Sequence, residues 1–249
     1  MDKETAHRLI EDTFNFPFDE NKYNKFVKNL IDDLVINLNP QWNNNKGLPS
    51  EIITKVKRYR DFGNYVYENG EKISVVSVEL LSESAVAKSR FLQRIFAKWY
   101  LENNNLSAIL IGFFSSTNED WRFSFIKLDY ERNIDTKGKI KISKKLTPIK
   151  RYSYLVGKNE PNHTAKSQLA PLLFDNCKNP SINNLIDSFS VENVTNEFFI
   201  KYKKLFYKLT DELKKLKESD KNILKDFNEK LINENNFAKK ILGQIVFLY

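Results

Sequence analysis

The segment Ile73–Tyr100, ISVVSVELLSESAVAKSRFLQRIFAKWY, joins an apolar run to a basic, aromatic one. The first part is typical of a buried β-strand. The second part has apolar residues at helical spacing and therefore predicts a helix. One carboxylate, Glu79, lies inside the apolar run. An acid at the end of a strand, just before a cationic helix, suggests either a metal-dependent nuclease site or a residue at the edge of a sheet.

The sequence around this segment predicts more strands. NYVYENGEKISVVSVELL indicates a hairpin with arms at 65–67 and 72–81, because Asn69 and Gly70 at its turn both tolerate positive φ. The nearly continuous apolar run LSAILIGFFSS, residues 106–116, is typical of a strand buried on both faces. WRFSFIKLDYE alternates as a strand, and two further strands are expected at 139–146 and 151–156.

Helices are expected in front of these strands at 3–14, 21–38 and 50–59, and between them at 84–103. The order predicts an α/β class with a mixed central sheet and flanking helices. After about residue 165 the chain becomes rich in Lys, and two long amphipathic helices are expected. We therefore expect an α/β domain at 1–165 and a helical segment at 166–249. The last residues, FAKKILGQIVFLY, begin an apolar helix, so we expect the chain to be cut from a longer protein.

The composition limits the possible chemistry. A single cysteine, Cys177, excludes an intramolecular disulfide and a zinc site of clustered cysteines, and the two histidines, His7 and His163, are far apart. A catalytic metal would therefore bind to carboxylates, which suit Mg²⁺. The net charge of +8 favours a polyanionic partner, although a Lys-rich protein without such a partner has the same charge. No signal peptide or membrane-spanning run is present, so we expect a cytoplasmic protein without a membrane partner.

Glu79 is the main catalytic candidate. Nucleases of the PD-(D/E)XK type place an acid and a (D/E)xK tripeptide on neighbouring strands, where the acids bind Mg²⁺ and the Lys positions the attacking water. Glu79 suits the acid of that tripeptide, and Glu68 on the hairpin turn is the nearest other candidate ligand. Leu81 stands in place of the Lys, and it shares the strand face of Glu79. Lys88 or Arg90 from the next helix can supply the missing cation.

Three interpretations of Glu79 remain open: a structural salt-bridged residue, an active metal site, and a degenerate one. The cations that follow it are also ambiguous. Arg90, Arg94 and Lys98 recur every four residues, and such a stripe either contacts DNA phosphates or forms a solvated helix face. Lys150 and Arg151 lie beside two tyrosines, which suits nucleic-acid binding or a structural turn.

Several blocks of the sequence are similar to one enzyme family. WRFSFIKLDY, LTPIKRYSYLVGKNEPNHTAKSQL, FSVENVTNEFFIKYKKLF and KKILGQIVFLY together resemble the N-terminal region of large single-chain type II restriction–modification enzymes, type IIG. The resemblance extends in scattered blocks from Asp19 to Tyr249, and no block is a catalytic motif by itself. In that family a nuclease-like region precedes a helical connector, an adenine-specific methyltransferase and a target-recognition domain.

The resemblance implies a PD-(D/E)XK nuclease-like core that hydrolyses DNA with Mg²⁺ if it is active, in a cytoplasmic bacterial defence protein. Its partners would be DNA and the methyltransferase and target-recognition domains of the same full-length chain. The Asn-Pro-Pro-Tyr tetrapeptide and the Gly-rich cofactor loop are missing, so no S-adenosylmethionine site is expected in this segment. The family's ELK-like tripeptide carries its acid over to Glu79 but not its Lys to Leu81. The alternative is a catalytically degenerate domain for DNA binding or interdomain contact.

Overall fold

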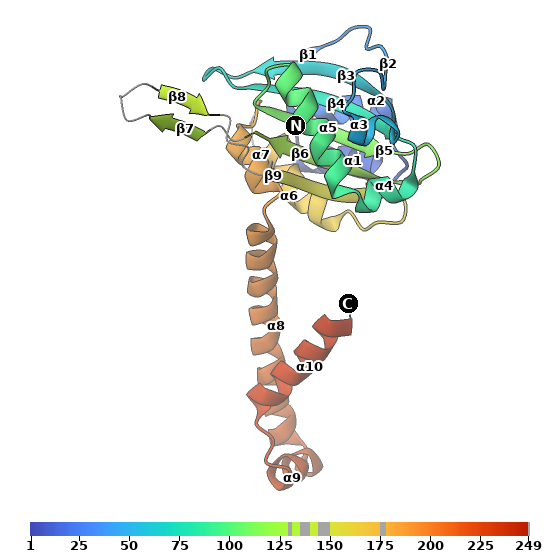
Figure 1. Ribbon diagram of the computed structural model, residues 1–249. Helices are drawn as coiled ribbons and strands as arrows, with labels where there is room; N and C mark the ends of the chain where they lie inside the picture. Colours follow the sequence, from blue (N-terminus) through green and yellow to red (C-terminus); the bar gives the residue numbers. More distant parts are fainter. Residues whose placement is uncertain (129–130, 135–139, 144–149, 175–177, 249) are drawn as a thin grey trace. The chain divides into compact units, whose positions relative to one another are not determined.

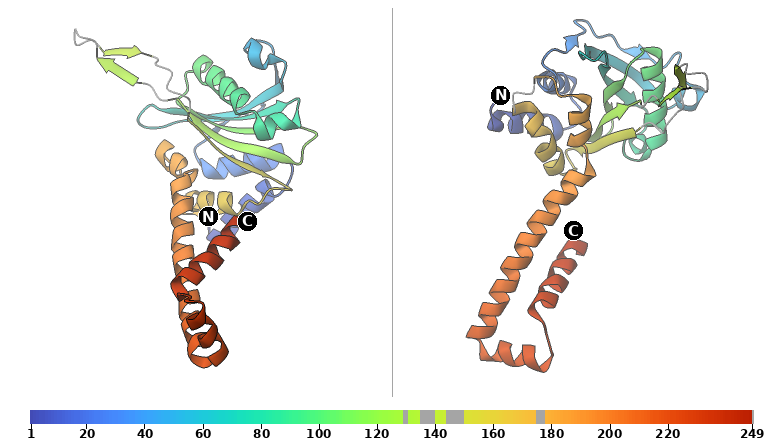
Figure 2. Two further views of the ribbon diagram at one scale, coloured as in Figure 1. Left: turned by 60° about the horizontal axis from the view of Figure 1, so that its bottom comes forward. Right: turned by 90° about the vertical axis from the view of Figure 1, so that its left-hand side faces the viewer.

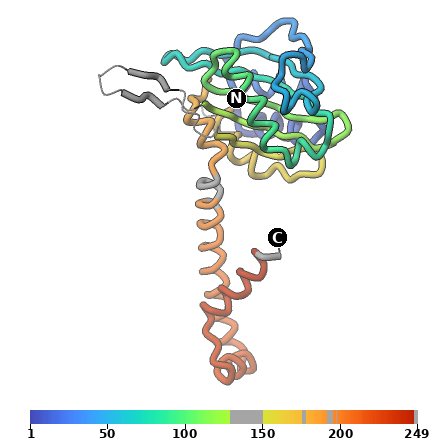
Figure 3. Tube along the Cα trace, viewed as in Figure 1, coloured from blue at the N-terminus to red at the C-terminus, as the bar shows by residue number. Residues whose placement is uncertain are grey.

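The computed structural model describes residues 1–128, 131–134, 140–143, 150–174 and 178–248 (Figure 1, Figure 3). The chain divides into two compact units, Met1–Ser190 and Val191–Tyr249. The boundary expected near residue 165 instead falls inside helix α6 (His163–Phe174). Ala165, Leu169 and Leu173 of this helix are buried in the core of the first unit, so the first unit extends to Ser190.

A mixed, open β-sheet forms the centre of the first unit. Its strand order is β1-β3-β4-β5-β6-β9, and β2 also pairs with β3. The central pair β4–β5 is parallel and the other pairs are antiparallel. The predicted mixed sheet with flanking helices is therefore confirmed. The strands are β1 (Val35–Ile36), β2 (Asn43–Asn44), β3 (Val56–Val66), β4 (Lys72–Leu80), β5 (Ala108–Phe114), β6 (Asp120–Lys127) and β9 (Lys150–Gly157), and a separate hairpin contains β7 (Glu131–Ile134) and β8 (Ile140–Ser143).

Helices cover both faces of the sheet (Figure 2). On one side, here called the α2 face, lie α1 (Lys3–Phe14), α2 (Glu20–Leu30), α6 and α7 (Ile182–Ser188). On the other side, here called the α5 face, lie α3 (Ser50–Ile53), α4 (Glu83–Lys88) and α5 (Arg90–Asn103). Successive residues of a strand point to opposite faces, and each face here has its own apolar core. This double coverage explains why β4 and β5 have nearly continuous apolar sequences.

Several predicted elements differ from the observed ones. The helix expected at 50–59 is only the short α3, because the β-prone sequence from Val56 onward pairs with β4 over the whole length of β3. The helix expected at 21–38 ends at Leu30. The helix expected at 84–103 is divided at Ser89, whose ψ of 73° is not helical, into α4 and α5.

The edge strand β3 is irregular at Gly63. The register between β3 and β4 shifts between Asp61 and Gly63, as in a β-bulge. Gly63 has φ of +151°, and a Cβ built there would lie 2.2 Å from the carbonyl oxygen of Val35. A residue without a side chain is therefore needed for β1 to pair with β3 at this point.

The second unit consists of three helices, α8 (Val191–Ser219), α9 (Lys221–Glu229) and α10 (Glu234–Leu248). Their shared core is small, with Leu213, Phe227 and Ala238 buried at its centre. Asp220 caps α9 by accepting hydrogen bonds from the backbone of Asn222 and Ile223. The expected helical C-terminal part is confirmed. In the part of the chain that the structure describes, no helix is long and apolar enough to cross a membrane.

Candidate functional site

Glu79 lies near the end of β4 with its side chain only 1% exposed, and it is the one buried carboxylate among the described residues. Both of its oxygens accept hydrogen bonds from cations of β3. Lys57 Nζ donates to Oε1 at 2.8 Å, and Arg58 Nε donates to Oε2 at 2.5 Å. The pairing register places Arg58 directly opposite Glu79, so the antiparallel hairpin itself brings the charges together.

These two cations determine the protonation of Glu79. Burial alone raises the pKa of a carboxyl group. The hydrogen bonds and charges of Lys57 and Arg58 outweigh this effect, and they hold the pKa of Glu79 below its ordinary value. Glu79 is therefore ionised at neutral pH, but each of its oxygens already has a positively charged partner.

A second carboxylate, Glu20 at the start of α2, lies on the same face of the sheet. It accepts a hydrogen bond from Arg60 Nη1 and also interacts electrostatically with Arg58 and Glu79. Burial raises the pKa of Glu20, and Arg60 and Arg58 counteract this shift. The guanidinium carbons of Arg58 and Arg60 lie 3.9 and 4.4 Å from the centre of the Trp42 ring, at cation–π distance. The Glu79 network, defined as Glu20, Trp42, Lys57, Arg58, Arg60 and Glu79, thus has three cations for two acids.

Two atoms of the Glu79 network, Glu20 Oε1 and Arg60 Nε, are buried without a hydrogen-bond partner among the described residues, and so is Ser77 Oγ. Ser77 lies two residues before Glu79, on the same face of β4. Among the described residues, no group of three or more His, Cys, Asp or Glu side chains is arranged to hold a metal ion. The carboxylates of the network are bound to cations instead.

Two predicted partners of Glu79 lie elsewhere. Glu68 is on the turn that joins β3 to β4, whereas Glu79 pairs with Arg58 at the other end of the hairpin. Eleven residues separate them in sequence, and the seven strand steps from Lys72 to Glu79 alone span about 23 Å. Glu68 therefore cannot share a metal ion with Glu79, which corrects the expected ligand pair.

Lys88 is the other predicted partner. It lies at the end of α4, where it lines a pocket of about 390 Å³ together with Leu81, Lys55 and three serines. Leu81 is 57% exposed. The position expected for the missing Lys is thus occupied by an exposed apolar side chain that lines this pocket. The cations that contact Glu79 come from β3, before it in the sequence, and not from the helix after it.

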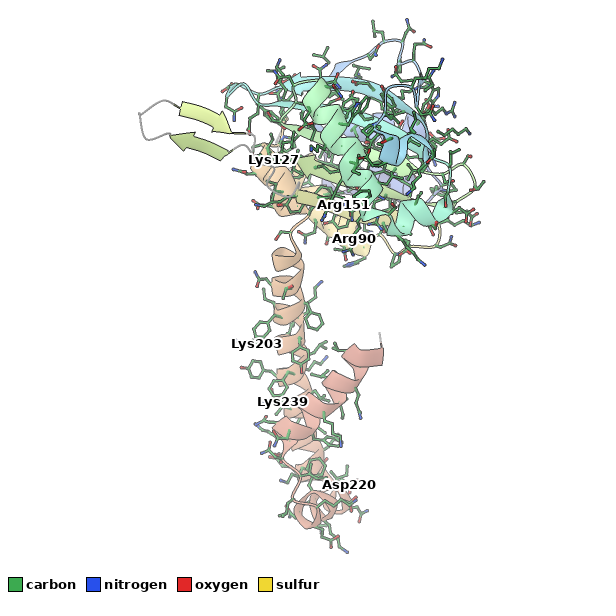
Figure 4. The ribbon with its side chains drawn as sticks, in the orientation of Figure 1. Arg90, Lys127, Arg151, Lys203, Asp220 and Lys239 are labelled. Carbon is green, nitrogen blue, oxygen red and sulfur yellow. The ribbon has the colours of Figure 1, made fainter. Side chains whose placement is uncertain are left out.

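A second group of charges lies on the α5 face. The four-arginine cluster is formed by Arg90 and Arg94 of α5, Arg122 of β6 and Arg151 of β9. Figure 4 labels Arg90 and Arg151, which lie near each other beside α5. Burial and the positive charges of the other three arginines lower the pKa of Arg151 to about 10. No described carboxylate forms an ion pair with any of the four.

The other candidate DNA contacts are distributed differently. Lys98 lies on α5, one turn beyond Arg94, and is half-buried. Lys150 begins β9 and is exposed. Arg90, Arg94 and Arg151 are therefore brought together by the fold, and Lys98 and Lys150 extend the basic surface from α5 and β9.

The sequence interpretation missed two groups of residues. Lys57 and Arg58 fall within the helix expected at 50–59 and Arg60 lies just beyond it, whereas the alternation in VKRYRDF is the signal for their true place in a strand. Arg122 lies in the alternating run WRFSFIKLDYE, but its role depends on β6 pairing with β9, which brings Arg122 and Arg151 to one side of the sheet.

In comparisons with known proteins, no family model, no curated protein and no solved structure matches the chain.

Proposed function

We propose that residues 1–190 form a PD-(D/E)XK nuclease-like domain that associates with DNA without cleaving it, within a type IIG-like restriction–modification protein. Its partners are then DNA and the methyltransferase and target-recognition domains of a longer chain in the bacterial cytoplasm. The order β3–β4–α4–α5–β5, with Glu79 near the end of β4, supports the nuclease-like part of the proposal.

The proposal depends on which charged side chains have a partner of opposite charge and which do not. The acid at the expected catalytic position has a cation on each oxygen, whereas Arg90, Arg94 and Lys98 on α5 have no ion-pair partner among the described residues. A carboxylate that binds Mg²⁺ must offer an oxygen to the metal. Each oxygen of Glu79 already accepts a hydrogen bond from a positively charged side chain, and these two charges would repel a metal ion unless Lys57 or Arg58 moves away. Uncompensated cations, in contrast, attract phosphates and release counterions on binding DNA.

DNA binding tests the first half of the proposal. We expect a fluorescein-labelled duplex to bind the full chain with an affinity that falls steeply as salt rises. Replacing Arg94 and Lys98 by Gln should weaken binding and reduce the salt slope. A control that replaces Lys25 and Lys28 of α2, on the other side of the sheet, should leave both unchanged. Equal losses in the two double variants would contradict an α5 surface.

A plasmid-cleavage assay with Mg²⁺ or Mn²⁺ tests the second half. We expect no cleavage by the full chain and no rise in melting temperature when either metal is added. Metal-dependent cleavage that Glu79→Gln abolishes would overturn the proposal.

One observation favours a second candidate, an active nuclease. Glu20 and Glu79 come from different elements to the same face of the sheet, as two metal ligands would. In that case Arg58 is the residue that prevents metal binding. The variant Arg58→Ala, which frees Glu79 Oε2, would then gain Mn²⁺ binding in calorimetry, and Glu20→Gln would abolish it. If Arg58→Ala binds no Mn²⁺, this candidate is wrong.

A further inference from the structure

The four-arginine cluster is more than a basic surface, because two of its members are fixed in place by neutral groups. Arg122 donates from Nε to the carbonyl oxygen of Val86 at 3.1 Å and from Nη2 to that of Ala87 at 2.9 Å. Its third nitrogen, Nη1, donates to Ser153 Oγ at 3.1 Å. All three nitrogens of this guanidinium are thus held by α4 and β9, and none of the partners carries a charge.

Arg151 is held in the same way. It donates from Nη1 to Gln93 Oε1, and the amide nitrogen of Gln93 donates in turn to the carbonyl oxygens of Ala85 and Val86. Gln93 is buried, so this connection is rigid. The result is a pair of partly buried guanidinium groups in fixed positions, with positive charges that no described acid neutralises by an ion pair.

Such an arrangement costs folding free energy, because like charges repel and burial disfavours ionised groups. The pKa of Arg122 is lowered by burial and by the charge of Arg90, and Glu160 is the one acid that counteracts this. The pKa of Arg151 is lowered further, as described above. A bound anion would relieve both effects at once.

Three neighbouring features also suit an anion. Arg90 and Arg94 are exposed and have no hydrogen bond to a described residue, so their guanidinium groups are free to close over a ligand. Arg90 is the first residue of the fourteen-residue helix α5, whose N-cap Ser89 makes no side-chain capping bond, and this helix end carries partial positive charge. Ser124 Oγ, on the same face of β6 as Arg122, is buried without a hydrogen-bond partner among the described residues.

We infer that the four-arginine cluster is a binding site for a phosphate group, with a preference for the phosphomonoester at the end of a nucleic acid or on a nucleotide. Four positive charges that act on one another exceed what a single phosphodiester charge requires. A phosphomonoester carries about −1.5 to −2 charges at neutral pH and three acceptor oxygens, which match paired guanidinium groups. That DNA carries this phosphate rests on the proposed function. That the cluster binds a phosphate group is argued from the arginines alone.

The site lies on the α5 face, whereas Glu79 lies on the α2 face. It therefore does not serve a reaction at Glu79. It would instead hold the 5′ or 3′ phosphate of a DNA end, or a free nucleotide.

Fluorescence anisotropy of the full chain tests the inference with two otherwise identical short duplexes, one with a 5′-phosphate and one with a 5′-hydroxyl. We expect the phosphorylated duplex to bind about tenfold more tightly. The exposed pair Arg90→Gln/Arg94→Gln should remove this preference without unfolding the protein. The single variant Arg122→Gln should also reduce it. Arg8→Gln on α1, which removes the same charge from the α2 side, is the matched control and should retain the preference.

A second measurement separates the possible sources of phosphate. The melting temperature of the full chain and of Arg90→Gln/Arg94→Gln is measured with inorganic phosphate or adenosine monophosphate. A chloride salt at the same ionic strength, without sulfate, is the reference. A rise in melting temperature that is lost in Arg90→Gln/Arg94→Gln supports the phosphate site, even if neither duplex binds. In that case the proposed function fails and the inferred site does not. Binding of both duplexes with equal affinity, together with no rise in melting temperature, overturns the inference and leaves the proposed function intact. A rise that persists in the double variant also overturns it.

Discussion

Replacing Glu79 by Gln tests whether this buried acid is a structural part of the hairpin. Gln has nearly the same shape but no charge, and one of its two terminal atoms is an NH2 donor, so it cannot accept hydrogen bonds at both positions that Lys57 and Arg58 occupy. The change should destabilise the protein at neutral pH without changing the fold. The wild-type side chain accepts two charge-assisted hydrogen bonds, at 2.8 and 2.5 Å.

The expected loss in free energy of unfolding depends on how well Lys57 and Arg58 are hydrated once Glu79 no longer neutralises them. A hydrogen bond to a charged group contributes about 1.5–3 kcal/mol. Lys57 is 47% exposed and Arg58 is 39% exposed, so both are partly hydrated when Glu79 is neutral. We therefore expect a total loss of about 2 kcal/mol, below the 3–5 kcal/mol of a fully buried pair. The matched control is Glu119→Gln, which removes an exposed ion pair to Lys158, and it should cost much less than Glu79→Gln because solvent screens that pair.

The pH dependence gives an independent test. The pKa of Glu79 is lower in the folded protein than its ordinary value of 4.5. The stabilisation by its ion pairs is therefore fully present above about pH 4.5, and it is lost as the pH falls through the lower folded pKa. The difference in free energy of unfolding between wild type and Glu79→Gln should decrease over that acidic range.

Urea denaturation followed by circular dichroism, repeated between neutral and acidic pH, measures these quantities. The reasoning is refuted if Glu79→Gln and Glu119→Gln are equally stable at neutral pH. It is also refuted if the difference between wild type and Glu79→Gln does not change with pH.

Three further predictions concern the fold. Gly112→Ala places a Cβ 2.8 Å from the ring of Phe18, so we expect a loss of about 1–3 kcal/mol in thermal denaturation, and an unchanged melting temperature would contradict this close contact. Trp121→Ala removes a side chain that is 1% exposed, and it should cost about 3–5 kcal/mol in urea titrations; a cost near that of an exposed residue would show that Trp121 is not buried. A fragment of residues 1–190 should unfold cooperatively, whereas 1–165 should not, because it lacks helices that complete the α2 core; cooperative unfolding of both fragments would contradict the boundary at Ser190.

Local patterns predicted the strands well where burial decides the structure. The apolar run of β5 and the alternation of β6 needed only side-chain periodicity. The same reasoning failed for VKRYRDF, because its position beside a helical turn favoured a helix and only pairing with β4 makes it a strand. Tertiary pairing overrides local preference there.

In the candidate sites, too, local sequence predicted single residues, whereas tertiary pairing decided their partners. Glu79 was recognisable as an unusual acid, but its partners were not, because a register of cross-strand pairs cannot be read from spacing along one strand. The four-arginine cluster combines residues of α5, β6 and β9. Arg122 and Arg151 are far apart in the sequence, and they meet only because β6 and β9 are neighbours in the sheet.

The irregular strand β3 has a consequence for association between molecules. Its outer side is covered by β2 near Arg58 and by β1 near Gly63, and the backbone of Asn37 donates to Phe62 between them. At the opposite edge, no described strand pairs with the outer side of β9. Of the two long strands β3 and β9, β9 is therefore the one whose outer side no described strand covers. A side chain at residue 63 would displace β1, expose the backbone of β3 and create a second edge prone to aggregation.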